Sequence, residues 1–182
     1  MRYISKDKIK DTSVSGFWRI AYVFFICAVL GWIWEEAYCL IKHGFWVERG
    51  FLFGPYLPIY GLGGMFIFML HDRWIKNPSL LFVTSIVVAG VLEYVSSWLL
   101  EVVFNEKWWD YTGRWLNLHG RIHLVGLIFF GLAGCGAVYF VLPPLLTLVN
   151  KMKSRIAINV CAAVLLVFSV DVAVSVIAHL IK

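Results

Sequence analysis

The chain has 182 residues, of which 61% are hydrophobic and 15% are charged. A typical soluble domain is about 45–50% apolar and about 25% charged, and one of this length could not bury so much apolar surface. The composition therefore excludes a disordered chain, a disulfide scaffold and an ordinary water-soluble enzyme. It predicts an all-α membrane protein that crosses the bilayer several times. The formal charge of +5 comes without a dense basic run, which argues against nucleic-acid binding.

Five apolar segments follow one another, and we expect them to form a single transmembrane domain over residues 1–182. A span needs about 20 mostly apolar residues. The expected segments are residues 17–41, 56–70, 79–104, 122–149 and 156–181. The second segment is short and rich in glycine and proline, which predicts a broken or re-entrant helix. The alternative for this segment is a tight interfacial turn followed by a glycine-packed span.

The positions of Lys and Arg predict the orientation. With a cytoplasmic N-terminus, ten of the 16 basic residues lie inside and six lie outside. Because cytoplasmic connections carry an excess of basic residues, this count favours a cytoplasmic N-terminus.

Acidic residues inside the expected spans are the first candidates for function, because a charge at the bilayer centre costs about 2.5–3.5 kcal/mol on insertion scales. The acids are Glu35, Glu36, Glu93, Glu101 and Asp171. Glu93, Ser97 and Glu101 follow one side of a helix at intervals of four residues. Glu35 and Glu93 are the strongest candidates for proton transfer, cation coordination or acid–base chemistry. For the others a structural explanation stands beside the functional one: Glu36 and Glu101 at the interface, and Asp171 paired with His179 or a lysine.

Two further stretches combine polar residues with helix breakers or aromatic residues. The first is ERGFLFGPYLPIYGLGG (48–64), which contains Arg49 and Tyr60. The second is EKWWDYTGRWLNLHGRIHL (106–124), whose Trp and Tyr residues fit an interfacial aromatic belt. The belt does not account for Asp110, Asn117 and Arg121, and Arg121 would pair with a carboxylate or a lipid phosphate.

Other chemistries find no support in the sequence. His119 and His123 would share a helix face at a spacing of four, but neither an H-E-x-x-H motif nor a thiolate partner accompanies them, so no metal is expected. The four cysteines have no C-x-x-C spacing and are expected to be small buried hydrophobic residues. The chain has no Walker A loop, and no cofactor is expected.

The runs GWIWEE, ERGFLFGPYLPIYGLGG and LEYVSSWLLE, followed by WWDYTGRWLNLHGRI, resemble a family of small bacterial integral membrane proteins. The family is labelled "putative ABC-transporter type IV" or "putative ABC transporter permease" (CmpB-like), and the resemblance covers roughly residues 15–140. The matching residues include Glu35, Arg49, Tyr60, Glu93, Glu101, Asp110, Tyr111, Asn117 and Arg121. Asn105 departs from the family pattern, where a glycine is usual, and so do His119 and His123.

The resemblance implies a transport component of the bacterial cytoplasmic membrane that works with a separate ATPase subunit. Five spans are few for a permease acting alone, so a homodimer or hetero-complex would be required, surrounded by membrane lipids. We expect a polar cavity near the outer side, to which these residues contribute: Glu35, Arg49, Tyr60, Glu93, Glu101, Asp110, Asn117 and Arg121. Two alternatives stay open at this point: an intramembrane enzyme acting on a lipid or isoprenoid, and a non-catalytic assembly subunit.

Overall fold

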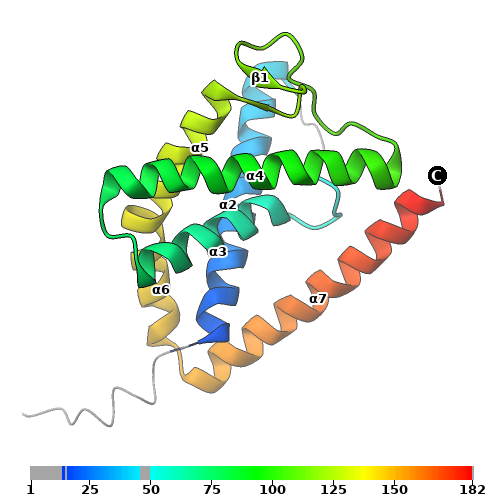
Figure 1. The fold of residues 1–182 in the computed structure, drawn as a ribbon. Helices are drawn as coiled ribbons and strands as arrows, with labels where there is room; N and C mark the ends of the chain where they lie inside the picture. The colour runs from blue at the N-terminus through cyan, green and yellow to red at the C-terminus, as the bar shows by residue number, and fades with distance from the viewer. Residues whose placement is uncertain (1–13, 15, 46–49, 182) are drawn as a thin grey trace, which may run out of the picture.

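The computed structural model describes residue 14, residues 16–45 and residues 50–181 and is almost wholly helical (Figure 1). The elements in chain order are α2 (Phe17–His43), α3 (Pro58–Arg73), α4 (Pro78–Phe104), β1 (Asn117–Leu118), β2 (Ile122–His123), α5 (Leu124–Gly136), η1 (Ala137–Val141), α6 (Leu142–Lys151) and α7 (Ser154–Leu180). The helical membrane-protein class predicted from composition is confirmed.

Four helices in the described part are long and apolar enough to cross a membrane: α2, α4, the continuous run α5–η1–α6, and α7. A helix of 27 residues is about 40 Å long, which exceeds the bilayer's hydrocarbon core of about 30 Å. In α5–α6 and α7 only 11% of the most apolar window is buried inside the protein. The remaining apolar side chains therefore suit a lipid environment.

The second expected segment (56–70) forms a continuous helix that follows a stretch of irregular backbone, rather than a helix broken in its middle. The irregular backbone of residues 50–57 comes first, and α3 then runs unbroken for 16 residues, or about 24 Å. Pro58 begins the helix, where its missing N–H costs no hydrogen bond. The backbone N–H of Leu57 donates to the carbonyl of Ala28 in α2 at 3.0 Å, so a neighbouring helix satisfies this irregular backbone.

Helix α3 packs closely between α2 and α4 because glycines face α2. A Cβ added at Gly61 would meet the Phe24 ring, and one at Gly64 would meet Cys27. The main core lies where α2, α3, α4 and the η1–α6 segment meet, and its buried members are Val23, Cys27, Ile67, Phe68, Leu81, Val138, Leu142 and Leu146. Three of the four cysteines are buried, as free thiols.

Helix α4 has clear start and stop signals and packs against α3 and α5. The Asn77 side chain caps its start by accepting hydrogen bonds from the N–H groups of Ser79 and Leu80. Asn105 ends it in the left-handed conformation, with φ of 55°. After glycine, asparagine tolerates that conformation better than most residues, so it can end the helix here.

Helix α7 begins beside the end of α6 and ends near the end of α4 (Figure 1), where the His179 ring packs against Phe104 and Trp108. Near its start the Tyr22 hydroxyl donates to the carbonyl of Ala157 at 2.7 Å. Farther along, the Phe168 ring packs edge-on against Phe24, Phe25 and Tyr56. These contacts join α7 to α2 and to the irregular segment before α3.

Candidate functional site

Two carboxylates and two tyrosines from distant parts of the chain meet in what we call the acid–tyrosine cluster: Glu35, Tyr60, Glu93 and Tyr111. The Tyr60 hydroxyl donates a hydrogen bond to Glu35 Oε1 at 2.5 Å. The Tyr111 hydroxyl donates to the Glu93 carboxylate, and both carboxylates act electrostatically on Tyr111. The predicted pair Glu35 and Glu93 therefore shares one polar site, built from α2, α3, α4 and the loop after α4.

Local packing sets the position of Tyr60. Its ring lies over Gly31 of α2, one turn before Glu35, and any Cβ at position 31 would overlap the ring. On another side the ring packs edge-on against Phe130 of α5, with centroids 5.6 Å apart. Because glycine leaves this space and Pro58 starts α3 two residues earlier, the hydroxyl reaches the Glu35 carboxylate.

Glu93 is the most deeply buried member of the cluster, with 6% of its surface exposed. Its Oε2 atom is buried and has no hydrogen-bond partner. Burial raises the pKa of Tyr111, and the neighbouring Glu93 carboxylate raises it further, so this hydroxyl stays protonated as a donor at neutral pH. In the part of the chain that the structure describes, the two ion pairs are Arg19–Asp72 and Arg121–Glu101, and neither includes the cluster.

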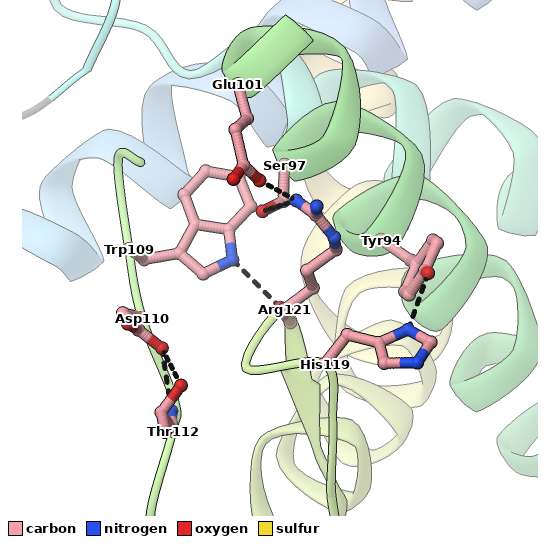
Figure 2. A network of polar contacts seen from close by, with 8 residues as sticks. All are labelled: Tyr94, Ser97, Glu101, Trp109, Asp110, Thr112, His119 and Arg121. Atoms are coloured by element: carbon pink, nitrogen blue, oxygen red, sulfur yellow. Dashed lines mark hydrogen bonds and ion pairs between the residues drawn. The ribbon is translucent and has the colours of Figure 1, made fainter. Parts of the chain in front are cut away.

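Arg121 forms a second polar group, the Arg121 network, one to two turns farther along α4 (Figure 2). Its guanidinium lies 2.6 Å from Glu101 Oε2 as an ion pair and donates to Ser97 Oγ at 3.3 Å. Its carbonyl accepts from Trp109 Nε1 at 2.9 Å. The polar side of α4 is thus divided: Glu93 faces the cluster, whereas Ser97 and Glu101 face Arg121.

Asp110 and Asn117 lie in the loop and contribute to its shape. Asp110 Oδ1 accepts hydrogen bonds from the backbone N–H and the hydroxyl of Thr112, and these bonds lower the pKa of Asp110 (Figure 2). Asn117 donates to the carbonyl of Arg114 and accepts from the N–H of Gly120. Neither residue contacts the acid–tyrosine cluster in these interactions.

The two histidines lie on a hairpin, not on a helix face. Strands β1 and β2 pair antiparallel with Leu118 opposite Ile122. The turn between them has positive φ at both central residues, His119 (54°) and Gly120 (68°), a pattern that matches the right-handed twist of a hairpin. His119 Nδ1 bonds the Tyr94 hydroxyl, whereas the His123 ring packs on Tyr111.

Asp171 has a structural position that explains its place in an apolar helix. It accepts hydrogen bonds from the N–H groups of Phe53 and Gly54, from the Tyr56 hydroxyl and from the Ser175 hydroxyl. It therefore fastens the segment before α3 to α7, a different partner from His179 or a lysine. Glu36 is buried, with 3% exposed, rather than at an open interface. Arg49 lies outside the described residues.

Tyr111 belongs to the cluster but was not among the residues expected to form the polar cavity. It stands in a run of tryptophans and tyrosines that an interfacial belt already explains. The signal that would have singled it out is its match to the family motif beside Asp110.

A family model described as "Putative ABC-transporter type IV" matches residues 22–176. The chain belongs to this family. The match confirms the resemblance seen in the motifs and covers the acid–tyrosine cluster, the Arg121 network and Asp171. No curated protein and no solved structure matches the chain.

Proposed function

We propose that this member of the ABC-transporter type IV family is the membrane-spanning subunit of a transport system, a permease that works with a separate ATPase. The acid–tyrosine cluster is the place where it handles the transported species or a coupling ion. One observation carries this proposal: Glu35 and Glu93, from two helices long enough to span the membrane, interact electrostatically within the bundle. The family match supports the transport part.

A structural role is a poorer explanation for these two acids than for Asp171. Of the four hydrogen bonds that Asp171 accepts, three come from the segment before α3 and hold it to α7. Glu93 instead keeps a buried oxygen without a partner, although such an oxygen costs about 1–3 kcal/mol. Intramembrane acids that persist at this cost typically belong to ion pathways and proton relays.

The arrangement of the helix ends supports a cytoplasmic N-terminus. Arg19 at the start of α2 lies 3.9 Å from Asp72 at the end of α3, and the N–H of Val14 donates to Asn150 Oδ1 before the α6–α7 turn. The start of α2, the end of α3 and the end of α6 therefore lie at one end of the protein. With that end in the cytoplasm of a bacterial cell, the hairpin loop faces outward.

An energy-coupling partner is part of the proposal, because the chain has no phosphate-binding loop of its own. A second copy of the chain, or a different membrane subunit, would complete a translocation path that so few helices do not enclose alone.

Affinity purification of the tagged protein from its native membrane in mild detergent, followed by mass spectrometry of proteins and lipids, tests the proposal. We expect a stoichiometric soluble ATPase with the wild type, with Glu93→Gln and with the control Asp72→Asn, and loss of transport only in Glu93→Gln. The absence of any ATPase would overturn the proposal. An enriched lipid or isoprenoid that disappears in Glu93→Gln would then indicate an intramembrane enzyme.

A further inference from the structure

Among the described residues, the two carboxylates of the acid–tyrosine cluster form no ion pair with a lysine or arginine. Glu35 and Glu93 interact electrostatically, and the ion pairs of the described residues lie elsewhere, at Arg19–Asp72 and Arg121–Glu101. In a low-dielectric interior an ionised Glu93 loses its hydration, and repulsion from an ionised Glu35 adds to that cost. The pair therefore requires a neutralising species.

The groups around the pair are hydroxyls, rings and one imidazole. From α2 and α3 come Tyr38 and Tyr60, and from the loop comes Tyr111, with His123 packed behind it at a ring distance of 4.3 Å. Burial and the positive charge of Arg114 lower the pKa of His123, so this imidazole is neutral at neutral pH. From α5, Phe130 contributes only an apolar ring.

On the side of α4 that carries Glu93, the next polar groups are Ser97 and Glu101, and both are engaged by Arg121. The guanidinium is therefore committed to an acid two turns away from Glu93. No described lysine or arginine supplies the missing positive charge by an ion pair to the cluster.

The hydrogen bonds show where a positive charge would go. Tyr60 donates its hydrogen to Glu35, and Tyr111 donates its hydrogen to Glu93. Neither hydroxyl has a second hydrogen for Glu93 Oε2, which is buried and unpartnered on a side chain that is 6% exposed. A protonated Oε2 would remove the charge from this atom, since a neutral carboxyl group costs far less to bury than an ionised one.

We propose that the acid–tyrosine cluster is a proton-binding site in which Glu35 and Glu93 hold a single proton, carried on Glu93 Oε2. The proposal deepens the proposed function, because the proton would be the coupling ion of the transport cycle. A metal ion fits less well: hard cations such as Ca²⁺ take about six to eight oxygen ligands. Within the described ranges no three acidic, histidine or cysteine side chains come together as a metal site.

Infrared difference spectroscopy of the purified protein in lipid nanodiscs tests this directly, through the carbonyl stretch of a protonated carboxyl group. We expect the stretch in the wild type at neutral pH and its complete loss in Glu93→Gln. In Tyr111→Phe the stretch should persist at a shifted frequency, because one hydrogen bond to the carboxyl group is lost. The control Glu101→Gln removes an acid of the same helix that pairs with Arg121, and it should leave the stretch unchanged.

Potentiometric titration of the wild type provides a second measurement that does not depend on a variant folding. As the pH of the wild type is raised, release of one proton per chain should coincide with the loss of the carboxyl stretch. Absence of the carboxyl stretch in the wild type, or its persistence in Glu93→Gln, would overturn the proposal. A stretch that is absent in the wild type and present in Arg49→Gln would overturn it too, by assigning the neutralising charge to Arg49. None of these readings depends on an ATPase, so the transport proposal succeeds or fails separately.

Discussion

Replacing Asp171 with alanine should destabilise the protein substantially while leaving its helices intact. The carboxylate accepts from Gly54 N at 2.8 Å, Tyr56 Oη at 2.5 Å, Ser175 Oγ at 3.0 Å and Phe53 N at 3.1 Å. Its removal leaves two partly buried donors, the Gly54 N–H and the Tyr56 hydroxyl, without an acceptor. Each such donor costs about 1–3 kcal/mol.

The other two donors contribute less to the expected loss. The N–H of Phe53 belongs to an exposed residue and can turn to solvent or lipid headgroups. The Ser175 hydroxyl can bond a carbonyl one turn back in its own helix. We therefore expect Asp171→Ala to lower the free energy of unfolding by about 3 kcal/mol, and Asp171→Asn, which keeps one acceptor oxygen, by about half as much.

The buried thiols of Cys27, Cys39 and Cys161 allow this to be measured in detergent, since a thiol-reactive fluorophore labels them only on unfolding. Asp72→Ala is the matched control, because it removes an exposed acid whose ion pair with Arg19 is worth about 0–1 kcal/mol. A double-mutant cycle with Tyr56→Phe should give a coupling energy of about 1.5–3 kcal/mol. Equal losses for Asp171→Ala and Asp72→Ala, or a coupling energy near zero, would refute the anchoring role.

Gly31→Ala should lower the free energy of unfolding by about 1–3 kcal/mol, because its methyl group overlaps the Tyr60 ring. Gly136→Ala faces open space and should raise it by up to about 1 kcal/mol through helix propensity, so similar thermal-denaturation results for the two would contradict the packing described. Arg121→Gln and Glu101→Gln should each cost about 2–3 kcal/mol, since each leaves a partly buried charge without its partner. The double variant should regain part of that loss, and strict additivity of the two single effects would show that the ion pair contributes nothing.

Most of the helices follow from hydrophobicity alone, and the exceptions have local causes. A long apolar segment such as α7 must be helical in a membrane, because no other backbone satisfies its own polar groups. The order of irregular backbone and helix around Pro58 was harder to predict. Proline is compatible both with a break inside a helix and with a helix start, and here the carbonyl of Ala28 in another helix decides between them.

The acids of the site were predictable because charge in an apolar helix is conspicuous, whereas their partners were not. Glu35 and Glu93 stand out by composition, yet their connection depends on Tyr60 reaching over Gly31. Asp110 is the opposite case: its charge and its place in a motif suggested a binding role. Its hydrogen bonds to Thr112 instead form a local turn. Contacts between residues far apart in the sequence, such as that of Tyr60 with Glu35, depend on how the helices pack. The pattern of residues along one sequence does not specify that packing.

The π-helical turn η1 has a consequence for how the chain tolerates changes in length. It precedes Pro143 and Pro144, which cannot donate backbone hydrogen bonds to the turn before them. A turn bonded from i to i+5 holds one residue more than an α-helical turn, so the surplus residue is absorbed within Ala137–Val141. Deleting one residue there would convert the turn to α-helix and keep Leu142 and Leu146 directed at the core. The same deletion in the middle of α4 would rotate every later residue by about 100°, carrying Ser97 and Glu101 away from Arg121.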